Sequence, residues 1–187
     1  MTRALFIIDV QNDFTEGGAL GCDGGNAVAA RITEWLAEHD YDHVFASRDW
    51  HDADNDNGGH FSPKPDFVNS WPPHCVSGTP GAEYHPALTL DKVDVHVRKG
   101  QGKPAYSIFD GVTDEGRSVI ATLDDLDVTD VDVVGIATDH CVRASALDAL
   151  RAGRSVRVLT RMIASVAPES SKAALAEMRS AGAQIVR

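Results

Sequence analysis

The sequence predicts an α/β fold built on a mainly parallel sheet. Two continuous apolar runs, residues 4–10 and 131–137, have the composition of strands that are buried on both faces. Further short apolar runs alternate with stretches of helical periodicity, and this alternation is typical of parallel strands joined by helices. With 187 residues the chain is long enough to bury a sizeable core, so we expect a single domain, residues 1–187.

The first half of the chain supplies three strands and one helix. The run at residues 4–10 is apolar except for Asp9, and helical periodicity follows at residues 26–38. Short apolar runs at residues 43–47 and 93–97 are predicted as the next two strands.

The second half continues the alternation. The strand at 131–137 is bounded by Asp130 and Asp139. Around it we expect helices at 114–124, 142–152 and 169–181, and strands at 156–159 and 183–186. The carboxyl ends of parallel strands meet at one edge, where α/β proteins bind ligands. The residues expected to share this rim are Asp9, Asp49, Lys99 and residues 139–141.

Composition narrows the classes of function. The chain has 17 Lys and Arg against 28 Asp and Glu, a net charge of -11, which disfavours nucleic acids and anionic membrane surfaces as partners. No apolar stretch near the start approaches the roughly 18 residues of a membrane span, and no signal core precedes it. We therefore expect a cytoplasmic protein, a monomer or small homo-oligomer, that acts on a small molecule. Gly24-Gly25 lacks the GxGxxG pattern, so no nucleotide cofactor is expected.

Cys141 is the candidate nucleophile among three cysteines. It precedes a predicted helix, whose N-terminus favours a thiolate and could hold a developing oxyanion; the alternative is a buried, inert cysteine. His140 is adjacent in sequence but projects in a different direction. Asp9, a carboxylate at the end of an apolar strand, is the better candidate base, and Lys99 could supply an ammonium that lowers the pKa of the thiol. Cys22 and Cys75 have no plausible activating base.

Residues 52–83 lack periodicity and are rich in Gly, Pro, Asp, Asn and Ser. A loop of this length is usually functional or disordered, and its aromatic and histidine side chains argue against disorder. In Asp49-Trp50-His51 the side chains of Asp49 and His51 are two positions apart, so on an extended chain they point the same way. Two more histidines, His60 and His74, follow in the loop. Three imidazoles and a carboxylate suit Zn²⁺, Fe²⁺ or Mn²⁺ better than Ca²⁺. We expect one divalent metal ion in a loop region at about 49–75, with the ligands Asp49, His51, His60 and His74; a surface or packing role is the alternative for each histidine.

Several motifs together resemble the nicotinamidase/pyrazinamidase branch of the isochorismatase-like cysteine hydrolases. They are Asp9-Val-Gln-Asn-Asp-Phe14, Asp49-x-His51, Trp71-Pro-Pro-His-Cys75, Lys99-Gly100 and Gly135-Ile-Ala-Thr-Asp-His-Cys-Val142, and they extend over essentially the whole chain. The metal-free relatives lack the set Asp49, His51, His60 and His74. The stretch between His51 and His60 is longer here than in the family pattern, which leaves the geometry of residues 52–59 open.

The resemblance implies a three-layer α/β/α fold with a six-stranded, mainly parallel sheet. It also implies a triad of Asp9, Lys99 and Cys141, a cis peptide between Ile136 and Ala137, and an oxyanion hole formed by the N–H groups of Ala137 and Cys141. The ring pocket would be lined by Phe14, Leu20, Trp71, Tyr106 and His140.

The implied activity is hydrolysis of nicotinamide to nicotinate and ammonia, and of pyrazinamide to pyrazinoate, within NAD salvage. A cysteine thioester would be the intermediate, and the metal would bind the ring nitrogen. Three alternatives remain. The first is a metal-activated-water amidohydrolase with a passive Cys141. The second is a related isochorismatase-like cysteine amidase for carbamoyl or ureido substrates, or an isochorismatase-like enzyme without metal, and the third is an inactive metal-stabilised binding protein.

Overall fold

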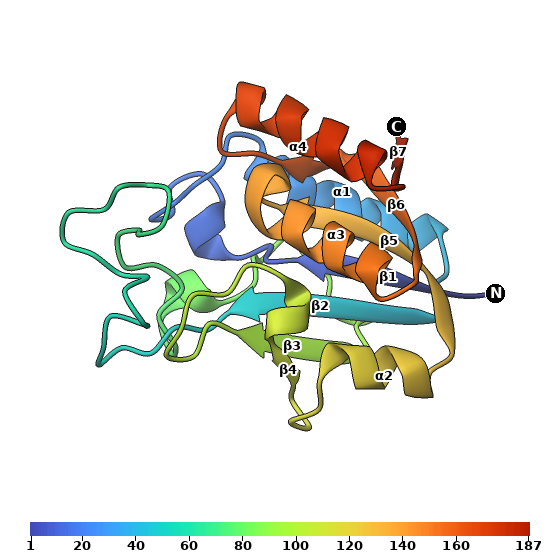
Figure 1. The fold of residues 1–187 in the computed structure, drawn as a ribbon, viewed down its shortest axis with the longest axis horizontal. Helices are drawn as coiled ribbons and strands as arrows, with labels where there is room; N and C mark the ends of the chain where they lie inside the picture. Colours follow the sequence, from blue (N-terminus) through green and yellow to red (C-terminus); the bar gives the residue numbers. More distant parts are fainter.

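One sheet includes strands from both ends of the chain. The computed structural model describes all 187 residues, and its sheet has the order β4-β3-β2-β1-β5-β6-β7 (Figure 1). All neighbouring strands are parallel except β3 and β4, which are antiparallel. The strands are β1 (Thr2–Ile8), β2 (His43–Asp49), β3 (Val95–Lys99), β4 (Val112–Thr113), β5 (Val128–Ile136), β6 (Ser155–Ala164) and β7 (Gln184–Val186).

Helices cover both faces of the sheet. The helices are α1 (Gly25–Glu38), α2 (Val119–Asp125), α3 (Arg143–Arg151) and α4 (Pro168–Ser180). Alternate residues of β1 point to opposite faces: Phe6 and Ile8 pack in one core with α2, α3 and α4, whereas Leu5 and Ile7 pack in the other with α1. The predicted mainly parallel α/β fold with helices on both faces is therefore confirmed. None of the helices is long and apolar enough to cross a membrane.

The prediction of six strands is wrong by one, because the sheet has seven. The additional strand, β4, has two residues and pairs with the end of β3. The helix expected at 114–124 begins only at Val119, because residues 113–116 form a turn in which the Gly116 N–H donates to the Thr113 carbonyl. The Ser118 side chain then accepts the Ala121 N–H and caps the helix.

The long loop after β2 contains no helix or strand between residues 50 and 79, but it is tied to the rest of the protein. The Cys75 N–H donates to Asp13 Oδ2 at 2.7 Å, and the Gly102 N–H donates to Asn57 Oδ1 at 3.1 Å. Isolated bridges from His51 to Val76 and from Phe61 to Trp71 join parts of the loop to each other. The loop projects beyond the carboxyl ends of the central strands, at the left of Figure 1. It therefore lies over the edge where the sequence places the functional side chains.

Candidate active site

Four charged or nucleophilic side chains meet at the carboxyl ends of β1, β2, β3 and β5. Lys99 ends β3 and is completely buried. Its Nζ lies 2.9 Å from Asp9 Oδ2 and 3.7 Å from Cys141 Sγ, and it also donates to the carboxylate of Asp49. The predicted shared rim is thus present, and it brings together residues that are up to 132 positions apart.

Asp9 is held by a residue that sequence reasoning missed. The Ser47 hydroxyl on β2 donates to Asp9 Oδ1 at 2.7 Å, and the Asp9 N–H donates to Ser47 Oγ at 3.3 Å. Because Ser47 accounts for one carboxylate oxygen, the other oxygen faces Lys99. A lone serine inside an apolar strand has no distinctive pattern, so the sequence offered no signal for this role.

Burial and neighbouring charges shift the pKa values of Asp9, Cys141 and Lys99. Burial raises the pKa of Asp9 above its usual value, although Lys99 opposes the shift. Burial also raises the pKa of the Cys141 thiol well above its usual value, again against the effect of Lys99. Burial alone would lower the pKa of Lys99, but Asp49 and Asp9 outweigh it and raise that pKa well above its usual value. The resting site therefore pairs a permanent ammonium with a carboxyl group that can accept a proton and a thiol that is not yet ionised.

Cys141 lies in one turn of π-helix, residues 138–142, between β5 and α3. The Val142 N–H donates to the Ala137 carbonyl at 3.1 Å, five residues back, and the α-helix starts only at Arg143. The peptide between Ile136 and Ala137 is cis, as the family resemblance implied. Ala137 and Cys141 both line the cavity described below. Their assignment as an oxyanion hole stays a prediction.

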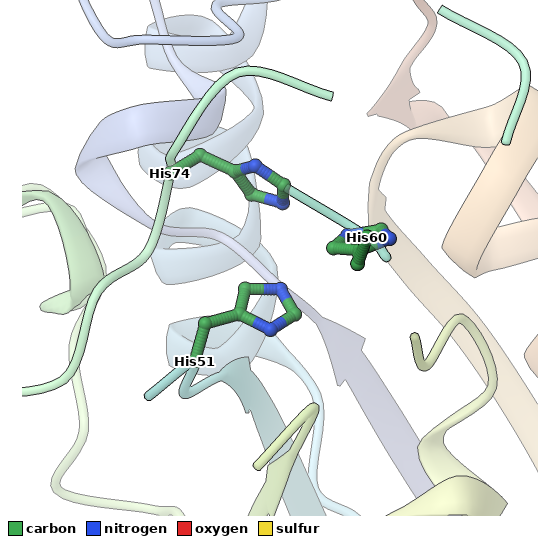
Figure 2. A group of neighbouring side chains, drawn as sticks. All are labelled: His51, His60 and His74. Carbon is green, nitrogen blue, oxygen red and sulfur yellow. The ribbon is translucent and has the colours of Figure 1, made fainter. Parts of the chain in front are cut away.

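Three of the four predicted metal ligands form a tight buried group. One ring nitrogen from each of His51, His60 and His74 lies within 4.8 Å of the others, and the three rings converge (Figure 2). The Nδ1 atoms of His51 and His74 donate to the carbonyls of Gly100 and Pro72, both at 2.8 Å. These bonds fix the ring orientations and leave each Nε2 free as a ligand.

The donor set fits a divalent ion that prefers nitrogen ligands. The buried Nε2 of His51 has no hydrogen-bond partner, as expected for a ligand atom. Burial, together with neighbouring His51 and His74, lowers the pKa of His60 to about 4, so this ring is in the neutral form that binds metals. Asp49 lies beside the three histidines, with Oδ2 3.5 Å from His51 Nε2 and 3.8 Å from His74 Nε2. Its other oxygen accepts from Lys99, so Asp49 joins the three-histidine group to the cluster of Asp9, Lys99 and Cys141.

A cavity of about 290 Å³ is lined both by Cys141 and by members of the histidine group. Trp71 and Tyr106 form one side of it, joined by a 3.1 Å hydrogen bond, and His140 packs edge-on against Trp71. The wall contains all five predicted ring-pocket residues as well as Asp49, His60, His74, Ala137 and Cys141. Other wall residues, including Cys22, Phe67 and Val166, were not predicted, because they lie in irregular segments whose path the sequence does not define.

Fold and site together define a class of protein. A buried thiol beside a carboxylate and an ammonium, at the carboxyl edge of a parallel sheet, is the arrangement of a cysteine hydrolase. Comparison with known sequences agrees: the isochorismatase domain matches residues 3–187. The chain belongs to the isochorismatase family.

Within this family, the chain is similar to proteins named as nicotinamidases and pyrazinamidases. The nicotinamidase/pyrazinamidase of Mycobacterium tuberculosis is 51% identical over 185 residues, which cover 98% of each chain. The pyrazinamidase of Pyrococcus horikoshii, solved in complex with zinc, is 36% identical with a TM-score of 0.83, over 100% of this chain and 99% of that one. PnC1 from L. infantum, solved in complex with nicotinate, is 33% identical with a TM-score of 0.86, over 100% of this chain and 92% of that one.

Proposed function

We propose that the protein is a nicotinamidase that hydrolyses nicotinamide to nicotinate and ammonia, and pyrazinamide to pyrazinoate, in NAD salvage. The observation that carries the proposal is that Cys141 lines the same cavity as His60 and His74, two members of the three-histidine group. A pyridine carboxamide has two polar parts that suit these two groups: its ring nitrogen suits a metal ion at the histidines, and its carboxamide suits attack by Cys141. The nicotinamidase and pyrazinamidase relatives support the same reading.

The cavity would bind the ring before any bond is broken. Asp49, His51, His60 and His74 would hold a divalent ion of the Zn²⁺, Fe²⁺ or Mn²⁺ class, which when bound supplies a Lewis acid for the lone pair of the ring nitrogen. The aromatic wall of Phe14, Trp71 and Tyr106 limits the ring to a narrow set of orientations. Holding the amide carbon close to the nucleophile replaces a bimolecular encounter with an intramolecular one.

Asp9 would then move protons between the reacting groups. The Cys141 thiol gives its proton to Asp9, and Sγ forms a bond to the amide carbon. The resulting oxyanion is stabilised by the N–H groups of Ala137 and Cys141; losing one such donor typically costs about 3–4 kcal/mol. Asp9 protonates the amino group, the C–N bond breaks and ammonia leaves. A water molecule then gives a proton to Asp9 and attacks the thioester, which releases nicotinate and returns the proton to sulfur.

Ammonia release from nicotinamide, measured beside elemental analysis of the purified protein, tests this function. We expect stoichiometric divalent metal and steady turnover in the wild type. Cys141→Ala should lower kcat at least a thousandfold and retain its metal, because the thiol is the nucleophile and not a ligand.

His74→Ala should instead lose metal and raise KM. Substantial turnover by metal-loaded Cys141→Ala would establish a metal-activated water as the nucleophile and refute the thioester route. No ammonia from the metal-loaded wild type would refute the function itself.

A further inference from the structure

Two exposed apolar side chains lie at the mouth of the active-site cavity. Phe67 and Val166 line the cavity, yet 58% and 56% of their surface stays exposed. Phe67 comes from the long loop and packs edge-on against Trp71, with ring centroids 6.0 Å apart. Val166 comes from the segment between β6 and α4. Two segments nearly 100 positions apart therefore each place one apolar side chain where a ligand would enter.

A carboxylate fixes the turn that carries Phe67. Oδ1 of Asp66 accepts three backbone N–H groups at 2.8–2.9 Å, from Val68, Asn69 and Ser70. These bonds lower the pKa of Asp66, so it is ionised at neutral pH. Phe67 has a φ of 56°, a conformation that bulky residues rarely adopt. Such conformations persist where the surroundings over-determine them, and they are frequent at ligand clamps.

A second carboxylate fixes the segment that carries Val166. Oδ1 of Asp139 accepts the Val166 N–H at 3.0 Å, and Oδ2 accepts the Ala167 N–H at 3.3 Å and the Ser170 hydroxyl. Asp139 is two residues before Cys141 in the same π-helical turn. Val166 is therefore held in a fixed position relative to the nucleophile.

The proposed binding mode directs one ring position toward this mouth. In nicotinamide the ring nitrogen is position 1 and the carboxamide is on position 3, so the two anchored groups lie on either side of position 2. Position 5 is opposite position 2 and points away from both anchors. With the nitrogen at the histidine group and the carboxamide at Cys141, position 5 would be the ring carbon farthest from both anchors and would point toward the exposed part of the wall, which includes Phe67 and Val166.

We propose that Phe67 and Val166 determine specificity at position 5 of the ring, where they favour apolar substituents. Asp66 and Asp139 are the positioning residues that hold them. The ligand class is 5-alkyl pyridine-3-carboxamides, and the inference rests on the proposed function for the orientation of the ring. Because the two side chains are already exposed and fixed, an alkyl group that covers them removes apolar surface from water without a large ordering cost.

Binding measured without catalysis tests the inference. Zinc-loaded Cys141→Ala protein is titrated calorimetrically with nicotinamide and with 5-propylnicotinamide. We expect the propyl compound to bind about tenfold more tightly, since even one methylene in an apolar pocket is typically worth about that factor. Phe67→Gly and Val166→Ala, each in the same background, should each reduce this advantage at least threefold. Glycine is favoured at the φ of residue 67, so the fold should tolerate that change.

Val68→Ala is the matched control, because Val68 belongs to the same turn and is 69% exposed but is not part of the cavity wall. It should keep the full preference for the propyl compound. An equal affinity for both compounds in the parent, or a preference that survives both Phe67→Gly and Val166→Ala, would overturn the inference. If the preference behaves as expected but the Cys141 enzyme releases no ammonia, the specificity assignment stands and the proposed hydrolysis fails.

Discussion

Lys99 shows how this site keeps charge in the interior. Burying an ammonium lowers its pKa and costs several kcal/mol unless opposite charges compensate. Here Asp9 and Asp49 both contact Nζ, and together they keep the lysine charged. The buried group therefore contains one cation and two carboxyl groups. The pKa of Asp9 is raised and that of Asp49 is lowered, which is consistent with Asp9 as the proton acceptor in the proposed mechanism.

Removal of the Lys99 charge should destabilise the protein strongly. Lys99→Met leaves Asp9 and Asp49 buried without a counter-ion, and breaking a buried pair in this way typically costs about 3–5 kcal/mol. Urea unfolding of the variant should show that loss, and the double variant Lys99→Met/Asp49→Asn should recover part of it. The control is Lys172→Met, whose ion pair with Glu169 is exposed and should contribute almost nothing. Superimposable curves for Lys99→Met and wild type would contradict this account of the site.

Gly100 should be required for metal binding, although it supplies no ligand side chain. A Cβ at this position would lie 2.5 Å from His51 Cε1 and 2.8 Å from Nδ1, so Gly100→Ala must displace the ring. We expect at least a tenfold weaker zinc affinity in a competition assay. Gly24→Ala is the control: its φ of 86° is close to the 87° of Gly100, but nothing lies within 4 Å of the added carbon. Equal zinc affinity in both variants would show that the contact is unimportant.

Sequence reasoning found residues whose chemistry conflicts with their surroundings, such as Asp9 in an apolar strand. It found the histidines because they cluster in a loop that needs an anchor. It missed Ser47, which acts through a hydrogen bond, and it included Gly100 in a motif without finding its role, which depends on the absence of a side chain. Neither property leaves a local pattern, because each depends on a contact with a distant segment.

At the scale of elements, the helices and strands with sustained hydrophobic periodicity were predictable from the sequence, whereas elements of one turn or two residues were not. The apolar runs of β1 and β5 identified the central strands, and α1 was predicted within one residue of its observed start. The strand β4 has two residues, too few for any periodicity. The π-helical turn at 138–142 has one turn only, so its hydrogen-bond pattern cannot be separated from the start of a helix by sequence alone.

Asp139 should couple this π-helical turn to α4 in a pH-dependent way. Burial raises the pKa of Asp139, but hydrogen bonds from the Ser170 hydroxyl and the Val166 N–H, together with the His140 ring 3.4 Å away, outweigh it and lower that pKa. A pKa that is lower in the folded state stabilises the fold above the unfolded value of 3.8, and this contribution is lost as the pH falls through the folded value. Asp139→Asn should therefore cost roughly 2 kcal/mol at neutral pH, from weakened charge-assisted bonds.

Thermal unfolding between pH 3 and pH 8 measures this contribution of Asp139 to stability. The difference in Tm between wild type and Asp139→Asn should be constant from pH 5 to pH 8 and should shrink below about pH 4, because there the unfolded wild type takes up a proton at Asp139 that the folded protein does not bind and that the variant cannot bind. Asp148→Asn provides a control, since Asp148 forms an exposed pair with Arg151 within one helix. A difference that instead grows as the pH falls below 4 would contradict the assignment.

At the scale of the whole molecule, the long loop and the sheet differ in what holds them in place. The sheet is stabilised by two apolar cores on its faces. The loop has little regular structure. Two isolated bridges join its parts to each other, and it is attached to other segments by hydrogen bonds such as those between Cys75 and Asp13 and between Gly102 and Asn57, while its histidines converge. His60 and His74 come from the middle and the later part of the loop, and His51 lies at its beginning, two residues after the end of β2. A metal ion at this point would therefore cross-link the loop to the sheet.

Metal removal should accordingly loosen the loop while the sheet stays folded. A tightly bound ion at 1,000 times its Kd stabilises a fold by about 4 kcal/mol, so chelation should lower the Tm by about 10 °C. Hydrogen exchange should increase mainly in residues 52–79 and little in β1 and β5, because only the loop depends on the ion. His74→Ala should show the fast exchange with or without chelator, whereas His85→Ala, outside the histidine group, should behave as wild type. Exchange that rises equally in loop and sheet would mean that the metal stabilises the whole fold and not this cross-link, and unchanged exchange would mean that the histidine group holds no structural ion.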